Sequence, residues 1–513
     1  MQIPGLRLRV ERLRAPLPVF RGTVDAHEWK EAARAVVAAH GRLVSTWGSD
    51  VDDGARGFAV CAAYAVPAGL FWLQLPLGGA TSYPDLASHF PFAGRMQRAT
   101  ADLLGLTADG AVDRRPWLAH GAWPADFFPL RPDRPVPDRA GEVKDYPFVS
   151  VQGDGVHEIA VGPVHAGIIE PGHFRFSVVG EKVLRLEERL GYTHKGIEKR
   201  FTQLAPLSAH RLAGRVSGDS TVAYAWAYCM ALEAAAGVLI PGRAAWLRAL
   251  LLERERVANH LGDLGALGND AALGFGLAQF SRLREDWLRV SMEIFGHRLM
   301  MDCVVPGGVA VDVEGSGLNR LRQQCDEVEA ELRILRDIYD EHAGLQDRFI
   351  ATGRVRPELA AALGLAGLAG RASGQAVDLR CKPSWTPYDA LRVRMATHKN
   401  GDVAARVAVR FEETLESLRL IRAFCGALPH GATQAPVALP GAAACGAGWI
   451  EGWRGEILVT LELDGTGAIR RCHCHDPSWQ NWPVLEHAVM DNIVPDFPLI
   501  NKSFNLTYSG HDL

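Results

Sequence analysis

The alternation of apolar and polar positions predicts a small mixed domain at the start of this chain. Strand-like apolar runs at residues 57–64 and 70–75 are interspersed with short helical stretches. That order is typical of an α+β domain of about 120 residues. Residues 129–147 are polar and rich in proline, which favours an extended backbone and cannot continue a helix. We therefore predict an N-terminal domain over residues 1–128 and a linker over residues 129–147.

The rest of the chain, residues 148–513, has mainly helical periodicity. From about Pro206 to Leu345 it is rich in Ala, Leu, Glu and Arg, with few helix breakers before Pro306-Gly307-Gly308. A further helix is predicted from Asp402 to about Phe424. Strand-like runs are predicted at 148–151, 174–179 and 456–463. The predicted fold class is an α+β N-terminal domain plus a mainly α-helical bundle domain with small β elements at both ends.

Composition narrows the protein classes that fit this pattern. The 513 residues are 48% hydrophobic and 22% charged, which is ordinary for a globular protein and excludes global disorder. The formal charge is −4, so the basic surface of a nucleic-acid-binding protein is not expected. The longest apolar stretch, 223–240, is interrupted by Glu233, and Met1–Arg7 lacks the basic-then-apolar order of a signal peptide. We therefore predict a cytosolic chain that does not itself cross a membrane.

The nine cysteines are scattered, and an odd, dispersed set argues against a disulfide framework. None of them form a Cys-x-x-Cys pair. Cys472 and Cys474 alternate with His473 and His475 on a predicted strand, so cysteines and histidines point to opposite faces. At most one same-face pair could reach a metal ion, which argues against a zinc site.

Two segments have the spacing of metal-binding motifs but lack the ligands. They are Arg215-Val216-Ser217-Gly218-Asp219-Ser220, which opens a predicted helix, and Asp476-Pro477-Ser478-Trp479-Gln480-Asn481. Cysteines in place of Ser217, Ser220, Ser478 and Asn481 would create two Cys-x-x-Cys pairs. Thiolates are the ligands that hold redox-active nickel and iron. Hydroxyl and amide groups are poor substitutes. We therefore predict no metal at Ser217, Ser220, Ser478 and Asn481.

A turn-rich segment, residues 162–176, carries two histidines, His165 and His173. Histidine exchanges protons near neutral pH, which suits a catalytic site. Histidines in a hairpin turn also cap backbone groups, and the residues alone leave both interpretations open.

Other charged segments have plain structural interpretations. Residues 191–199 form a cationic loop bounded by glycine, which is typical of a solvated loop. Within 255–260, Glu255 and Asn259 lie four residues apart on a predicted helix, as do Arg256 and His260; such pairs usually cover an exposed helix face. Asp270 follows ten residues after His260, just past a glycine-rich break.

Taken together, these segments resemble the large subunit of membrane-bound, energy-converting nickel–iron hydrogenases, including the formate hydrogenlyase type, and the related quinone-site (49 kDa-type) subunit of respiratory complex I. The matching motifs, within residues 145–513, are Gly162-Pro163-x-His165, His173-Phe174-Arg175, Gly191-Tyr192-x-His194-x-Gly196-x-Glu198-Lys199, Glu255-Arg256-x-x-Asn259-His260-Leu261, Pro306-Gly307-Gly308-Val309, Arg371-Ala372-Ser373-Gly374, Asp378-Leu379-Arg380, Pro387-Tyr388-Asp389, Gly401-Asp402 and Pro477-Ser478-x-x-Asn481. The N-terminal domain resembles the 30 kDa-type complex I subunit around Arg98 and Asp113–Leu118, although the family's acidic neighbour of that arginine is not evident. In the formate hydrogenlyase type this domain is fused ahead of the large-subunit domain, as here.

The resemblance implies a peripheral subunit of an oxidoreductase complex on the cytoplasmic side of the inner membrane. It implies an iron–sulfur small subunit and antiporter-like membrane-arm subunits as partners, with electron transfer coupled to ion translocation. In the hydrogenases, two Cys-x-x-Cys pairs hold nickel and iron, and here all four thiolates are replaced. We therefore expect no cofactor in this chain, an iron–sulfur cluster in its partner, and no H2 chemistry.

In complex I the same cavity faces a quinone headgroup. By resemblance, His173 takes the position of the histidine that faces the headgroup, and Asp270 takes that of its aspartate partner; Arg215 stands where the family has a tyrosine. We expect a hydrogen bond between His173 and Asp270, which would orient the imidazole and raise its proton affinity for a quinone-like acceptor. Two alternatives remain open. Arg215 could pair with Asp219 or Asp270 and fill the old metal site, or the chain could be a catalytically silent scaffold between small subunit and membrane arm.

Overall fold

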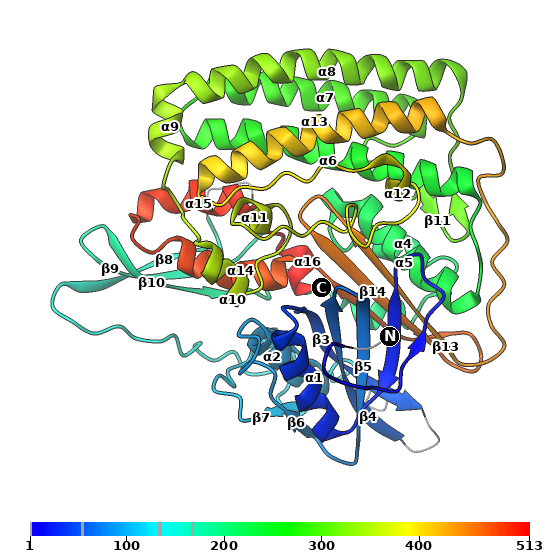
Figure 1. Cartoon of the computed structure of the whole chain (residues 1–513). Coiled ribbons are helices and arrows are strands. Elements are labelled where there is room, and N and C mark those ends of the chain that lie inside the picture. The colour runs from blue at the N-terminus through cyan, green and yellow to red at the C-terminus, as the bar shows by residue number, and fades with distance from the viewer. Residues whose placement is uncertain (1–2, 53–55, 132–135, 166–168) are drawn as a thin grey trace.

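The computed structural model describes residues 3–52, 56–131, 136–165 and 169–513. Residues 132–135 of the predicted linker and Ala166-Gly167 of the predicted histidine turn lie outside these ranges. Figure 1 shows a sheet from the N-terminal part of the chain on one side, a layer of long helices on the other, and a second sheet between them.

The N-terminal sheet has five strands in the order β1-β2-β5-β4-β3. Its strands are β1 (Glu11–Arg12), β2 (Val19–Thr23), β3 (Arg42–Asp52), β4 (Arg56–Val66) and β5 (Gly69–Gly78), and it is accompanied by β6 (Ser82–Pro84), β7 (Thr107–Asp109), α1 (Ala26–Ala38) and α2 (Ala93–Leu104). Asp25 begins α1 with a capping box, because its side chain accepts from the N–H of Glu28 while the Glu28 side chain accepts from the N–H of Asp25. The strands predicted at 57–64 and 70–75 are confirmed.

A three-stranded sheet, ordered β10-β9-β8, follows the linker. Its strands are β8 (Val156–Val161), β9 (His173–Val179) and β10 (Lys182–Arg189). The run predicted at 174–179 lies in β9, but the strand predicted at 148–151 is wrong. There Phe148 packs on the ring of His173, and the N–H of Val149 donates to the Glu187 side chain instead of to a neighbouring strand.

The helical layer is formed mainly by long helices that lie side by side in Figure 1. They are α5 (Thr221–Ala236), α6 (Gly242–Asp270), α7 (Gly274–Phe295), α8 (Gly315–Glu341) and α13 (Val403–Ala427), with the short strands β11 (Val304–Val305) and β12 (Gly308–Val309) between α7 and α8. The predicted helix at 402–424 is confirmed as α13, and Asp402 caps its first turn. The remaining helices are α3 (Ile197–Phe201), α4 (His210–Ala213), α9 (Ala343–Phe349), α10 (Pro357–Ala362), α11 (Gly367–Ala372), α12 (Tyr388–Leu391), α14 (Ser478–Ala488), α15 (Phe497–Phe504) and α16 (Ser509–Asp512).

The central sheet consists of β13 (Ala444–Glu451), β14 (Glu456–Leu463) and β15 (Ile469–His475). Helix α5 packs on β13 at very close range, because a Cβ atom at Gly448 would lie 1.9 Å from the carbonyl of Ala227. Glycine in the strand and alanine in the helix therefore allow the two backbones to touch.

The central sheet also contacts the N-terminal sheet. The ring of His473 stacks on Trp47 at 4.4 Å and hydrogen-bonds with Ser45 at 2.8 Å. Cys472 and Cys474 point to the other face of β15, as predicted, and both are buried. The junction of the two sheets is therefore both packed and hydrogen-bonded.

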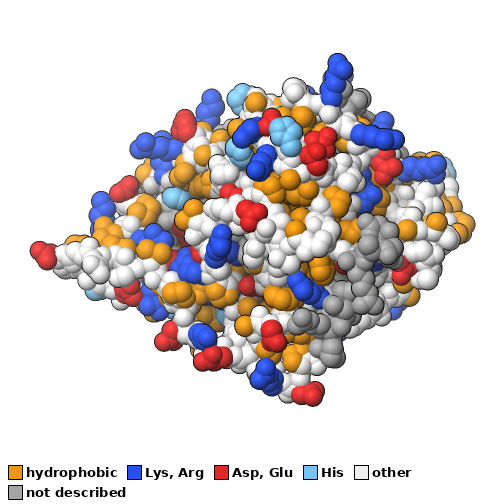
Figure 2. Space-filling model, turned by 90° about the horizontal axis from the view of Figure 1, so that it is seen from below, with side chains coloured by type: hydrophobic (Ala, Val, Ile, Leu, Met, Phe, Trp, Pro, Cys, Tyr) orange, Lys and Arg blue, Asp and Glu red, His pale blue; other side chains and the backbone are white. Residues whose placement is uncertain are grey.

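The surface carries no single dominant charge on the side seen from below, where hydrophobic side chains are interspersed with basic and acidic ones (Figure 2). Across the described residues, none of the helices combines the length and the apolar character that a membrane span requires.

Candidate functional site

The two segments with metal-motif spacing meet in the interior. Ser217 and Ser220 lie just before α5, while Ser478 begins α14 and Asn481 follows one turn later. The Ser217 hydroxyl lies 3.2 Å from that of Thr507, whose N–H donates to Ser478 Oγ over 3.1 Å. All four motif side chains are buried. Folding therefore brings both motif segments to one place.

An ion pair lies beside the two serines that precede α5. Arg454, from the turn between β13 and β14, binds both carboxylate oxygens of Asp219, with Nη1 2.8 Å from Oδ1. Ser217 donates to the same Oδ1 over 2.6 Å, and Trp453 Nε1 donates to Ser220 Oγ over 3.1 Å. Burial disfavours the Asp219 carboxylate, but Arg454 and the serine hydroxyls outweigh that effect and lower its pKa. Both serine hydroxyls are thus engaged with protein partners.

The second segment is also occupied by protein contacts. Asn481 Oδ1 accepts from the N–H of Ala366 at 2.9 Å, and Asn481 Nδ2 donates to the carbonyl of the same residue at 3.3 Å. Hydroxyl and amide groups are poor ligands for nickel and iron. Within the described residues, no three His, Cys, Asp or Glu side chains are grouped to hold a metal ion. The residues present here do not fit the nickel–iron group that the fold family implies.

The structure separates the two residues expected to form an acceptor pair. His173 Nδ1 donates to the carbonyl of Gly162 at 2.9 Å, and its Nε2 accepts from Arg175 Nε at 3.4 Å. Asp270, the last residue of α6, forms an ion pair with Lys502 of α15 at 2.9 Å. No hydrogen bond joins His173 and Asp270 in the described part of the chain, because each side chain binds other partners, so the expected pair is wrong. His173 does cap a backbone group, as the structural interpretation of the turn predicts.

Arg215, expected beside that pair, lies at the surface. Its Nη1 and Nη2 bind the two carboxylate oxygens of Asp302 at 2.7 and 2.9 Å, and its side chain is 44% exposed. An ion pair with Asp219 or Asp270 is therefore wrong for Arg215. The cation that binds Asp219 is Arg454, and sequence reasoning missed it because it lies more than 200 residues away, in a turn that has no distinctive spacing.

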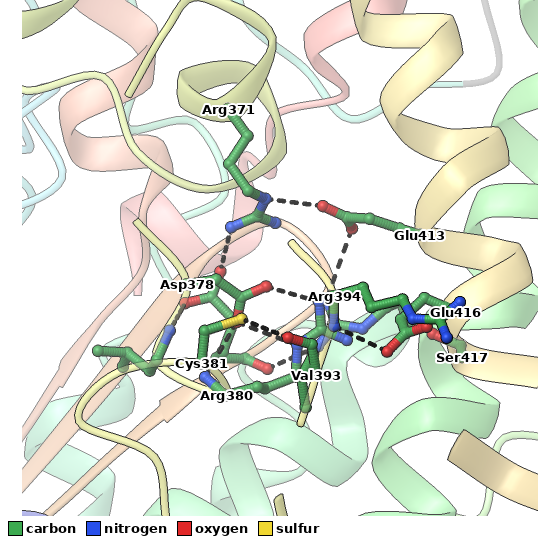
Figure 3. Close-up of polar contacts among 12 residues, drawn as sticks. Arg371, Asp378, Arg380, Cys381, Val393, Arg394, Glu413, Glu416 and Ser417 are labelled. Carbon is green, nitrogen blue, oxygen red and sulfur yellow. Dashed lines mark hydrogen bonds and ion pairs between the residues drawn. The ribbon is translucent and has the colours of Figure 1, made fainter. Parts of the chain in front are cut away.

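A buried ionic network contacts Trp453 and includes residues of α6, α11 and α13; Figure 3 shows part of it. The ring of His260, on α6, contacts Trp453 edge-to-face with centroids 6.1 Å apart. Its Nε2 lies 3.0 Å from Glu413 of α13. Figure 3 shows Arg371 reaching from α11 toward Glu413, and the same guanidinium binds Glu451 of β13; both contacts are 2.7 Å.

The network continues away from the motif segments. Arg380 binds Asp378 at 2.7 Å and Glu253 of α6 at 3.0 Å. Tyr388 and Ser417 also donate to Glu253, at 2.8 and 2.6 Å. Breaking such fully buried pairs leaves an uncompensated charge, so each member depends on the others. Burial, only partly offset by Arg371, raises the pKa of Glu451 to about 7, so this acid can exchange a proton near neutral pH.

Glu255 is a buried acid without an arginine or lysine hydrogen-bonded to it among the described residues. Its carboxyl group accepts from the N–H of Val222 at 2.6 Å and of Ala223 at 3.2 Å, in the first turn of α5. Burial raises its pKa to about 8. The prediction that this part of α6 presents an exposed face is wrong, because α5, α7 and α13 all pack against α6. The i,i+4 spacing of polar residues within 255–260 is the same on a buried and on an exposed helix, so it could not predict this burial.

An open hollow of about 1860 Å³ lies between the body and residues 139–148 of the linker, and His173 lines it. Burial lowers the pKa of His173, so the ring is neutral at pH 7. Since the Gly162 carbonyl can only accept, Nδ1 carries the proton. His173, which is predicted for the acceptor site, therefore borders an open space large enough for a ligand.

Family comparisons agree with the two-part organisation of the chain. Residues 272–444 match the model of the respiratory-chain NADH dehydrogenase 49 kDa subunit, and residues 22–140 match that of the 30 kDa subunit. Both models therefore occur in this one chain.

Individual proteins extend the match. The chain is 30% identical over 440 residues to formate hydrogenlyase subunit 5 of Escherichia coli (strain K12), which covers 84% of this chain and 77% of that protein. It is 31% identical over 350 residues to the carbon monoxide-induced hydrogenase of Rhodospirillum rubrum, covering 68% of this chain and 97% of that protein. A chain of the membrane-bound sulfane sulfur reductase, an archaeal respiratory membrane complex, has the same fold, with a TM-score of 0.66 and 24% identity over 70% of this chain and 99% of that one.

Proposed function

Because this chain belongs to the family of complex I 30 kDa/49 kDa-type subunits and hydrogenase large subunits, we propose that it is the large-subunit component of a membrane-bound oxidoreductase complex that works without a nickel–iron centre. An iron–sulfur small subunit delivers electrons to an acceptor bound at this chain, and antiporter-like membrane-arm subunits move ions in response. The chain itself lies peripherally, on the cytoplasmic side of the membrane, and carries no cofactor of its own.

One observation supports the loss of the metal centre above all others. The residues at the four thiolate positions are hydrogen-bonded to the protein, and Arg454 places a positive charge beside them. A metal cation at that place would have to break these hydrogen bonds and the Arg454–Asp219 ion pair, and would find neutral hydroxyl and amide ligands that do not favour nickel or iron.

The electron acceptor in this proposal is quinone-like and binds in the hollow beside His173. The imidazole is neutral, is oriented by Gly162 and borders open space. It can therefore exchange a proton with a reduced acceptor. Asp270 and Arg215 take no direct part in this scheme, because their side chains bind Lys502 and Asp302.

The test uses the purified complex that contains this chain. We expect less than about one tenth of a nickel per chain by elemental analysis, no H2 oxidation, and reduction of a soluble quinone analogue. His173→Ala should lower quinone reduction at least tenfold, whereas His157→Ala, an exposed histidine of β8 in the same sheet, should leave it unchanged. About one nickel per chain together with H2 oxidation would refute the proposal.

A second candidate function is a catalytically silent scaffold that docks the small subunit onto the membrane arm. The observation that favours it is the separation of His173, Asp270 and Arg215, which each bind other partners. If His173→Ala leaves both electron transfer and ion pumping unchanged in the whole complex, the scaffold is the better description.

A further inference from the structure

We propose that the hollow under the linker binds a planar organic monoanion, an aromatic carboxylate, and that Arg189 pairs with its charge. This inference goes beyond the proposed function, because it holds whether or not the chain takes part in electron transfer. It rests on the contacts of Arg189, on the rings around it and on the open space they border.

Arg189 is a buried cation that no acidic side chain contacts directly among the described residues, although the charge of Asp102 acts on it from farther away. Arg189 ends β10, is 4% exposed and lines the hollow. Its Nη1 donates to the carbonyl of Pro116 and its Nη2 to that of Ala119, but no ion pair to a carboxylate is found for it among the described residues. Burial, which no carboxylate contact offsets, lowers its pKa. A buried guanidinium that binds only carbonyl groups is costly, and an incoming carboxylate would offset that cost.

The nearby acids are engaged elsewhere. Asp102 accepts three backbone N–H bonds from Trp117, Leu118 and Ala119, on the opposite side of the segment whose carbonyls bind Arg189. Glu187, two residues away on β10, binds Arg115 at 2.6 Å. The segment from Pro116 to Ala119 therefore lies between Arg189 and Asp102, and neither acid neutralises Arg189 by contact.

Two other cations of the hollow have acidic partners, and a third, Arg139, is exposed to solvent. Arg175 binds Glu158 at 3.0 Å, and Lys144 binds Glu142 at 3.2 Å. Arg189 is thus the buried cation of the hollow that lacks a carboxylate contact. A single guanidinium matches the charge and the planar two-oxygen geometry of one carboxylate, whereas it would neutralise only half of the charge of a dianionic phosphate.

Aromatic rings determine the shape of the ligand that fits. The ring of Tyr146 lies 4.3 Å from the Arg189 guanidinium carbon. Tyr192 is 39% exposed and meets His120 edge-to-face at 4.5 Å, and Trp123 and Phe148 also line the hollow. Such rings favour stacking with a flat apolar body. A flat ring system with one carboxylate therefore complements both the walls and the cation.

The test compares two ligands that differ only in charge, 2-naphthoate and 2-naphthamide, by calorimetry with the full-length chain. We expect naphthoate to bind at least tenfold more tightly. Arg189→Gln should abolish this preference by weakening naphthoate alone, and Arg189→Lys should keep part of it. Arg185→Gln is the matched control, because Arg185 is on the same strand, is only partly buried and does not line the hollow.

Three outcomes would overturn the proposal: equal binding of the two ligands, binding of neither, or an unchanged preference in Arg189→Gln. Because Arg189 binds two carbonyls, thermal unfolding is measured for every variant. If Arg189→Gln does not fold, Tyr192→Ala is the variant that tests the proposal, since this exposed side chain contributes little to the stability of the fold. It should weaken both ligands at least threefold, and unchanged affinities would contradict a site in this hollow.

Discussion

The centre around Asp219 and the hollow around Arg189 each contain an arginine. The two arginines differ in whether a carboxylate neutralises their charge. In the centre, Arg454 binds a carboxylate through two contacts, and serine hydroxyls complete the arrangement. In the hollow, Arg189 binds only carbonyls and borders open space. The centre is electrostatically complete without a ligand, and the hollow is not. A chain of this fold can therefore lose its metal ligands at the centre and still offer, in the separate hollow around Arg189, a site where an anionic ligand would bind favourably.

The strongest test of that contrast removes the cation from the centre. Arg454→Met leaves the half-buried Asp219 carboxylate without its counter-ion, which costs about 1–3 kcal/mol of unfolding free energy. Urea denaturation measures this loss. The matched control is Arg282→Met, whose ion pair with Glu331 is exposed on both sides and should cost less than about 1 kcal/mol. Equal losses for the two variants would mean that the centre is not held by its ion pair.

The next test concerns the acid that supports the centre from α6. Glu255 has a pKa raised to about 8 from its ordinary 4.5 by burial. Below pH 4.5 it is protonated in both folded and unfolded states, so its contribution is fully present. Between pH 4.5 and 8 the unfolded state loses the proton while the folded state keeps it, and stability falls. At 1.36 kcal/mol per pKa unit, the loss by pH 9 is about 5 kcal/mol.

Glu255→Gln removes that titration and should flatten the decline in stability between pH 5 and 9. The variant pays a cost at every pH, because one amide group then faces the N–H of Ala223. The slope with pH, measured by urea denaturation, is therefore the quantity to compare, and not the stability at one pH. Glu293→Gln, an exposed acid of α7, serves as the control and should keep the wild-type slope. A wild-type slope in Glu255→Gln would show that this acid is ionised in the folded chain.

These results indicate which features of the molecule are predictable from sequence. The periodicity predicts α13 and β14 closely, because local pattern and burial agree there. It fails at 148–151, where side chains of Tyr146, Phe148 and Glu187 replace strand pairing. The motif spacing also shows from the sequence alone which residues stand where the related hydrogenases have thiolates.

The partners that fill the centre are not predictable in the same way. Arg454, Trp453 and Thr507 reach the motif segments only through the tertiary fold, and no spacing links them to Asp219. The same reason explains why Asp270 and Arg215 have unexpected partners. Resemblance transfers the position of a residue in the chain, but the direction of its side chain depends on neighbours that differ from those in the family.

A milder test addresses the wall of the hollow. The hydroxyl of Tyr146 accepts a hydrogen bond from Arg98, which joins the linker to α2. Tyr146→Phe removes this charge-assisted bond and should lower the unfolding free energy by about 1–2 kcal/mol. The ring that faces Arg189 stays in place, so the preference for naphthoate over naphthamide should persist. Loss of the preference with unchanged stability would assign ligand recognition to the phenol and not to Arg189.

The smallest expected effect is at Arg215, which resemblance places at an acceptor site. Its ion pair with Asp302 is solvent-exposed, with side chains 44% and 36% accessible, and exposed pairs contribute about 0–1 kcal/mol because water and salt screen them. Arg215→Ala should therefore change the unfolding free energy by less than about 1 kcal/mol, and raising the salt concentration should remove even that difference. In the assembled complex it should also leave quinone reduction within twofold of wild type. A loss comparable to that of Arg454→Met would mean that Arg215 turns inward when partners bind, and that the buried centre, like the hollow, still needs a charge from outside.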